Sequence, residues 1–138
     1  MSALKKTTQQ IDLGFVSVNL IKPHIVCITC LKEEVIDVEM GIKILKGIKD
    51  LVDNRPYATI INISNLYAPS KEFYKFIVSQ RSREKDNIIA RGIVTTNMAQ
   101  KIDAQNFINF FKPLTPTKLF LTIEDAIVWI EPQLSDVI

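Results

Sequence analysis

The chain has 138 residues, a net charge of +2 and 47% apolar residues. This length is typical of one domain, and the composition is that of an ordinary soluble globular protein. So small a charge, without a stripe of Lys or Arg interleaved with aromatic residues, excludes a typical nucleic-acid surface. No run approaches the roughly 20 apolar residues that span a bilayer, and no apolar segment follows Lys5 and Lys6 as in a signal peptide. We therefore expect a cytoplasmic protein that neither spans a membrane nor binds nucleic acid.

The first part of the chain predicts a hairpin, a helix and a third strand. In residues 14–21, Val16, Val18 and Leu20 fall on one side and Phe15, Ser17 and Asn19 on the other. This period of two is typical of a half-buried strand. Residues 24–31 form a nearly continuous apolar run, as in a strand buried on both faces. The short turn at Lys22 and Pro23 makes these two strands antiparallel. Residues 37–52 then change to helical spacing, and residues 57–63 predict the next strand.

The middle of the chain predicts two more helices around a fourth strand. Ser70 is a good N-cap for a helix over residues 71–80, which carries Phe73, Phe76 and Ile77 at helical spacing. Residues 88–96 predict the strand. A third helix, capped by Thr96 or Asn97, is expected to run to residue 111, before a proline.

The last unit is a strand followed by a capped helix. Residues 118–122 predict the fifth strand, and Thr122 caps the helix with Asp125 three residues later, as in a capping box. The helix then repeats apolar residues at the spacing of a stripe that faces a core: Ile123, Ala126, Ile127 and Ile130.

The predicted order is therefore β-β-α-β-α-β-α-β-α, which places the chain in the α/β class. Strands that alternate with helices predict a parallel sheet with right-handed crossovers, and the initial hairpin adds one antiparallel strand. We expect a mixed, mostly parallel sheet of five strands with four helices, in a single domain over residues 12–131. Residues 1–11 and 132–138 are expected to be frayed.

This order resembles the STAS-like family, named for sulfate transporters and anti-sigma-factor antagonists. The stretch NFINFFKPLTPTKLFLTIEDAIVWI is similar to the tail of small bacterial STAS-like proteins of uncharacterised function. The strand order matches over residues 12–131. The resemblance implies a mixed sheet flanked by helices, without enzymatic activity. The residues that carry it are Asn106, Phe107, Pro113, Pro116, Lys118, Leu119, Phe120, Glu124, Ala126, Trp129 and Ile130.

The resemblance also directs attention to the segment after the third strand. Antagonists of anti-sigma factors carry there an Asp-Ser-Ser-Gly-like stretch, whose serine a partner kinase phosphorylates. Here the stretch reads NISNLYAPSKE, without the acidic residue and the glycine. We therefore expect Ser70 to cap its helix and not to be phosphorylated. The same loop is the expected contact surface for an unidentified protein partner, through Asn65, Leu66, Tyr67, Ser70, Lys71 and Glu72.

Cys27 and Cys30 match the C-x-x-C spacing of redox dithiols and half-sites for zinc. Inside a strand, residues three apart point to opposite faces, with Cα atoms about 10 Å apart, whereas a disulfide needs about 7 Å or less. A second cysteine pair is absent from the sequence. We expect two reduced thiols on opposite faces of the sheet, and no metal.

The remaining candidates for chemistry do not combine into a catalytic set. His24 is the only histidine; it reads as a turn residue, and the alternative of a general base or ligand has no evident partner in the sequence. No glycine pattern for phosphate or dinucleotide binding and no nucleophile elbow occur. We therefore expect neither an enzyme nor a cofactor.

Arg91 interrupts an otherwise apolar strand. A charge in that position needs water, a partner carboxylate or a ligand anion, so Arg91 is a candidate anion or ion-pair site. The third helix carries more apolar surface than one buried face requires. Core packing is the first explanation, and a homodimer contact or an apolar pocket is the alternative for Phe107, Phe110 and Phe111.

These observations predict a non-catalytic STAS-like regulatory or protein-interaction module. The alternative, from a different class, is a carrier of a small apolar or acyl ligand. Self-association as a homodimer is expected because closed two-fold dimers are the commonest oligomers.

Overall fold

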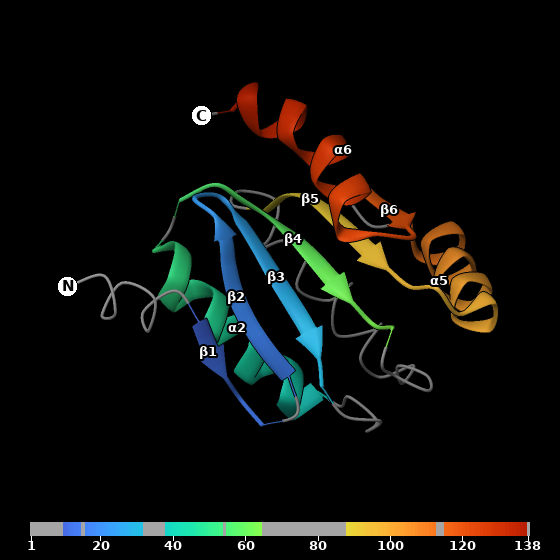
Figure 1. Ribbon diagram of the computed structural model, residues 1–138, viewed down its shortest axis with the longest axis horizontal. Coiled ribbons are helices and arrows are strands. Elements are labelled where there is room, and N and C mark those ends of the chain that lie inside the picture. Colours follow the sequence, from blue (N-terminus) through green and yellow to red (C-terminus); the bar gives the residue numbers. More distant parts are fainter. Residues whose placement is uncertain are drawn as a thin grey trace.

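The computed structural model describes residues 10–14, 16–31, 38–53, 55–64, 88–112 and 115–137. These residues form a six-stranded sheet in the order β1-β2-β3-β4-β5-β6, with helices on both faces (Figure 1). The strands are β1 (Gln10–Asp12), β2 (Val16–Lys22), β3 (Ile25–Cys30), β4 (Tyr57–Asn62), β5 (Ile88–Val94) and β6 (Thr117–Phe120). The described helices are α2 (Val38–Val52), α5 (Met98–Phe111) and α6 (Ile123–Ser135).

Strand direction is nearly uniform. β2 is antiparallel to its neighbours β1 and β3, whereas β3, β4, β5 and β6 are mutually parallel. The arrowheads of these four strands accordingly point the same way in Figure 1. Their carboxyl ends therefore share one edge of the sheet. We call this the carboxyl edge and define it by the residues that follow the strands: 31, 63–64, 95–98 and 121–122.

The described residues form six strands and three helices, which does not match the expected five strands and four helices. The additional strand is β1, which pairs with β2 from Gln10 opposite Asn19 to Asp12 opposite Ser17. The reversal between them uses Gly14 at φ +87°, a conformation that favours glycine, and the Asp12 carboxylate accepts a hydrogen bond from the Gly14 N–H at 2.8 Å. A strand of three residues is too short to show a period. The helix expected over residues 71–80 lies outside the described residues.

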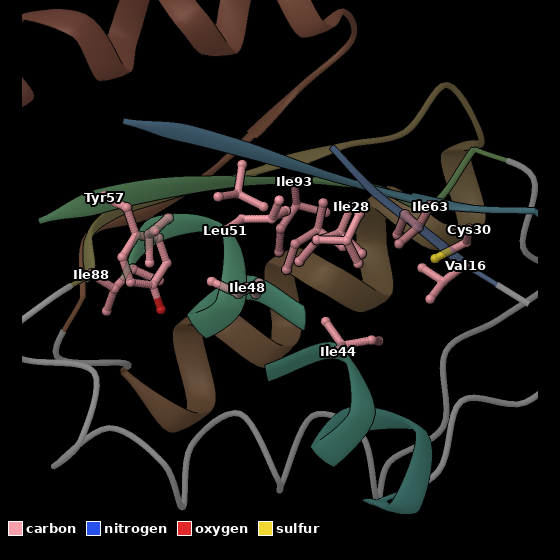
Figure 2. Close-up of a cluster of buried hydrophobic side chains, with 14 of the residues drawn as sticks. Val16, Ile28, Cys30, Ile44, Ile48, Leu51, Tyr57, Ile63, Ile88 and Ile93 are labelled. Carbon is pink, nitrogen blue, oxygen red and sulfur yellow. The ribbon is translucent and has the colours of Figure 1, made fainter. Parts of the chain in front are cut away.

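The first core lies between the sheet and the helices α2 and α5. Figure 2 shows it filled mainly by aliphatic side chains, with Tyr57 and Cys30 among them, and with both helices on one side of the sheet. The helical spacing expected over residues 37–52 is confirmed, because Ile44, Ile48 and Leu51 of α2 share one face and are buried in this core. Alternate residues of β2 and β3, including Val18 and Ile28, meet them from the sheet.

The second core lies between the opposite face of the sheet and α6. Ala126, Ile130 and Leu134 of α6 are buried against the sheet. Gly92 of β5 makes this approach close, because a Cβ at this position would lie 3.1 Å from the Cβ of Ala126. Burial on both faces of β3 is likewise confirmed, since Cys27 belongs to this core and Ile28 to the first.

Ordered secondary structure extends beyond the predicted range of residues 12–131 at both ends. α6 continues through Pro132 to Ser135. A proline inside a helix removes one backbone hydrogen bond. The Gln133 side chain donates to the Trp129 carbonyl at 3.1 Å, and burial of Leu134 continues the apolar stripe by one more turn.

Candidate functional site

The candidate site has two parts: a polar cluster inside the first core and an apolar surface at the carboxyl edge. The cluster is centred on Arg91, which is only 3% exposed. The Arg91 side chain therefore does not extend along the sheet into water. The alternatives that remain from the sequence are an ion pair and a bound anion, and both stay predictions.

A β-bulge determines which face Arg91 occupies. Tyr57 pairs with Ile88, but the next residue of β4, Ala58, pairs with Ala90, so Ile89 is an extra residue in β5. Without this insertion, Arg91 would stand opposite Ile60 and face α6. With it, Arg91 lies opposite Thr59 and shares a face with Ile93, which belongs to the first core. Bulges commonly redirect a side chain in this way beside functional sites.

Two threonines flank Arg91 in the register of the sheet, and a third, Thr115, lies just before β6. Thr59 of β4 and Thr117 of β6 are its partners on either side. The guanidinium Nη1 donates to the Thr117 hydroxyl at 3.4 Å, and this hydroxyl donates to the Thr115 carbonyl at 2.9 Å. The backbone N–H of Arg91 also donates to the Pro116 carbonyl. Thr117 is not the sole partner of Arg91.

Two hydroxyls of this cluster have unused hydrogen-bonding capacity. Thr59 and Thr115 are both almost completely buried, and neither Oγ1 atom has a hydrogen-bond partner. A buried polar atom without a partner is unusual, because it has lost its hydrogen bonds to water without replacement. Sequence reasoning did not single out these threonines, because a threonine in or beside a strand is ordinary and only the register of the sheet brings Thr59 beside Arg91.

The carboxyl edge carries exposed apolar side chains. Leu31 follows β3, Met98 begins α5 after β5, and Leu121 follows β6. Met98 is 68% exposed and Leu121 is 57% exposed, and Leu31 is exposed as well. The backbone holds the β5 and β6 ends together here, since the Thr95 N–H donates to the Phe120 carbonyl at 3.1 Å. Apolar residues just beyond predicted strands were the available signal, and the sequence reading did not use it.

Two helix caps fix the backbone at this edge. The Asn97 side chain accepts from the Gln100 N–H at 3.1 Å, and the Thr122 hydroxyl accepts from the Asp125 N–H at 3.1 Å. Both caps agree with the sequence, which offered Asn97 as one of two candidates and Thr122 as the only one. The buried Thr95 hydroxyl and the Gln100 side chain form a further hydrogen bond of 2.7 Å below the surface. The edge is therefore held by capped helix starts.

The aromatic residues of the third helix divide between inside and outside. Phe107 is buried in the first core, whereas Phe110 is 82% exposed. The side chain of Phe111 lies outside the described residues. Core packing therefore explains Phe107, and the expected dimer contact, with Phe110 as its exposed candidate, stays a prediction.

The cysteines have the expected arrangement. Cys27 lies in the second core and Cys30 in the first, and both are reduced thiols. Burial raises the pKa of Cys30 to about 12, with a smaller contribution from Cys27, and burial also raises the pKa of Cys27. Both sulfurs are therefore protonated, and thus poor nucleophiles, near neutral pH.

The remaining residues singled out from the sequence do not add to the candidate site in the described part of the chain. His24 places its Nδ1 2.8 Å from the Pro56 carbonyl, a bond that ties the hairpin turn to the start of β4. Within the described ranges, no three His, Cys, Asp or Glu side chains come together as metal ligands would. The predicted contact residues Asn65, Leu66, Tyr67, Ser70, Lys71 and Glu72 lie outside the described residues.

Among the described helices, none combines the length and the apolar character needed to cross a bilayer.

Comparisons with known proteins place this geometry in context. The family model described as "Domain of unknown function (DUF7793)" matches residues 20–134. None of the curated proteins matches the chain. A solved structure of an uncharacterised protein from the DUF3478 family, with a SpoIIAA-like fold, from Shewanella loihica PV-4, is similar with a TM-score of 0.57. The two share 13% sequence identity, over 83% of this chain and 90% of the other. This similarity confirms the STAS-like fold that the sequence predicted.

Proposed function

Because the chain belongs to the DUF7793 family, a domain of unknown function, we propose from its geometry that it is a non-catalytic protein-interaction module with a regulatory role. Its contact surface in this proposal is the carboxyl edge. The observation that carries the proposal is the exposure of Leu31, Met98 and Leu121 beside the ends of three parallel strands.

The position of these residues supports contact with a protein. In open sheets with parallel strands, ligands bind outside the carboxyl ends of the strands, and we propose that a protein partner uses the same end here. Burying exposed Met and Leu side chains stabilises an interface by about 25 cal/mol per Å² of apolar surface removed from water. Met98 is also a residue type that adapts to different partner surfaces. β4 also ends at this edge, with Ile63 and Ser64, which directly precede the contact segment predicted from the sequence, residues 65–72.

Substitution at the edge tests the proposal. The double variant Met98→Ser/Leu121→Ser removes two apolar side chains from the carboxyl edge. The control Ile42→Ser/Val128→Ser removes two similarly exposed apolar side chains from the outer surfaces of α2 and α6. Each tagged variant is used to capture partners from lysate of the native host. We expect the edge variant to lose a partner that the wild type and the control retain, with unchanged melting temperatures.

The result that would overturn the proposal is equal capture by both double variants, because contact would then not use this edge. The carrier alternative has no supporting observation in the described part of the chain. Native mass spectrometry of freshly purified protein separates the two classes. A mass increment from a retained lipid would favour the carrier, whereas the mass of the bare chain or of a protein complex would favour the interaction module.

A further inference from the structure

We infer that two copies of this chain associate through the outer edge of β6, with the two β6 strands antiparallel and Leu119 opposite the partner's Leu119. β6 is the last strand of the sheet, and none of the other described strands pairs with its outer side (Figure 1). This contact runs along the side of the sheet and not along the carboxyl edge, so it does not depend on the proposed function. It also differs from the dimer contact expected at Phe110.

The first argument is the direction of the β6 backbone. The carbonyls of Pro116 and Phe120 accept hydrogen bonds from backbone N–H groups at the two ends of the pairing with β5. In a strand, the N–H and C=O groups of successive residues point alternately to the two sides. The backbone groups of Thr117 and Leu119 therefore point away from β5. Such a row of N–H and C=O groups is a template for pairing with another strand.

The second argument is the register that the side chains select. Outward backbone groups pair with outward groups, so only two two-fold antiparallel registers overlap three of the four residues of each β6 strand. One register places Lys118 opposite the partner's Lys118, and like charges directly opposite each other are destabilising. The other places Leu119 opposite the partner's Leu119 and Lys118 opposite the partner's Phe120. Charge therefore selects the second register.

The third argument is that this register brings together groups that already attract each other within one chain. The Lys118 Nζ lies 5.8 Å from the centroid of the Phe120 ring, and this ring packs against Trp129 with centroids 5.5 Å apart. Across the two-fold axis, Lys118 and the partner's Phe120 form a non-hydrogen-bonded pair, with Cα atoms about 4.5 Å apart. Within one strand, residues two apart are separated by about 6.6 Å. The partner's ring is therefore the nearer one, and symmetry forms this cation–π contact twice.

The opposite face of the strand contributes apolar contact. Leu119 is partly buried against the first core and keeps part of its surface exposed. Pairing with the partner's Leu119 removes more of this surface from water. A strand of four residues gives a small interface, and small interfaces belong to weak, transient complexes. We therefore expect a reversible dimer whose population rises with concentration.

Cysteine cross-linking of the full chain tests the register. In Leu119→Cys the two new thiols lie opposite each other, with Cα atoms about 5.5 Å apart, which is within the range of disulfides. Lys118→Cys is the matched control, because in this register its two copies are diagonal neighbours roughly 7–8 Å apart. Cys27 and Cys30 are buried and protonated, so they do not compete near neutral pH. Both variants are treated with a mild oxidant and resolved on a non-reducing gel.

We expect Leu119→Cys to form a covalent dimer and Lys118→Cys to form several-fold less of it. Sedimentation equilibrium of the reduced proteins measures the reversible association. Lys118→Glu should weaken dimerisation by about tenfold, because each dimer loses two cation–π contacts. Lys46→Glu makes the same change of charge on the exposed side of α2 and should leave the dissociation constant unchanged.

Three results would overturn the inference. A wild type that remains monomeric at its highest soluble concentration would exclude the dimer. Equal cross-linking of both cysteine variants, or more from Lys118→Cys, would exclude the register. Equal dissociation constants for Lys118→Glu and Lys46→Glu would exclude the contact between Lys118 and the partner's Phe120. This last comparison decides alone if Leu119→Cys fails to fold, since Lys118 is exposed and its replacement leaves the core intact.

Discussion

Gly92 is a residue at which the sheet and α6 approach closely. A Cβ there would lie 3.1 Å from Ala126 Cβ, so α6 would have to shift by a few tenths of an ångström, whereas its distance of 3.5 Å from the Phe120 ring is an ordinary contact. We predict that Gly92→Ala lowers the free energy of unfolding by about 1–3 kcal/mol, the usual effect of overpacking. Urea denaturation measures it. An unchanged midpoint would show that α6 moves away from β5 without loss.

The buried Cys30 thiol makes the free energy of unfolding depend on pH in the alkaline range. Its pKa is raised by burial to about 12, so the folded chain keeps this proton after the unfolded chain has released it near pH 9. The stabilisation is complete below pH 9 and is lost as the pH rises towards 12, at up to about 1.4 kcal/mol per pH unit. We predict that Cys30→Ala, although less stable at pH 8, loses less stability than the wild type between pH 8 and pH 10.5. Urea midpoints in reductant measure this difference, and equal losses would contradict it.

At the scale of elements, α2 contains a glycine that the packing does not require. A Cβ on Gly47 would meet Ile11 Cδ1 at 3.6 Å, an ordinary contact, and the residue lies inside the helix. Alanine is favoured over glycine in a helix by about 1 kcal/mol. We predict that Gly47→Ala raises the free energy of unfolding by about 0.5–1 kcal/mol. It is also the control for Gly92→Ala, because the same change should have the opposite sign, and a loss of stability here would refute the packing described for β1 and α2.

The start of α6 depends on its cap. The Thr122 hydroxyl accepts from the Asp125 N–H at 3.1 Å, on an exposed turn where no core contact is involved. Thr122→Ala should therefore destabilise the protein by about 1 kcal/mol, and Thr122→Ser, which keeps the hydroxyl, should retain most of that stability. Thermal melts of the two variants test this. Equal melting temperatures for Ala and Ser would mean that the hydrogen bond contributes nothing.

The elements show where sequence reasoning succeeds. The cap at Thr122 and the stripe through Ile130 are local patterns, and the structure confirms both. β1 was missed because its existence depends on pairing with β2 and not on its own three residues. The C-terminal end of the ordered chain was placed too early, because a proline such as Pro132 normally ends a helix. In the structure, burial of Leu134 against the sheet stabilises one more turn of α6.

The candidate site was predicted less completely, for a related reason. Arg91 was identified because a charge in an apolar strand is visible in the sequence. Its two neighbours in the sheet, Thr59 and Thr117, come from strands far apart in the chain, and the bulge in β5 determines that Arg91 lies beside them. The exposure of Met98 and Leu121 likewise depends on what the other elements leave uncovered.

At the scale of the whole molecule, the two sites belong to different layers. The first core, with α2 and α5, encloses Arg91, whereas the carboxyl edge gathers the ends of β3, β4, β5 and β6 on one rim (Figure 1). Four parallel strands fixed by backbone hydrogen bonds make this rim a firm platform. Caps at the first turns of α5 and α6 add to it. A surface of this kind suits recognition without a change in the backbone.

Site-specific photo-crosslinking tests the central claim, contact through the carboxyl edge, most directly. A photoreactive amino acid is placed at position 121 on the edge or, as a control, at position 128, an even more exposed apolar position on the outside of α6. Each protein is irradiated in its native host, and adducts are resolved by denaturing gel and mass spectrometry. We predict a discrete protein adduct from position 121 and none from position 128. Adducts of equal yield from both positions, or an adduct from position 128 alone, would contradict the account.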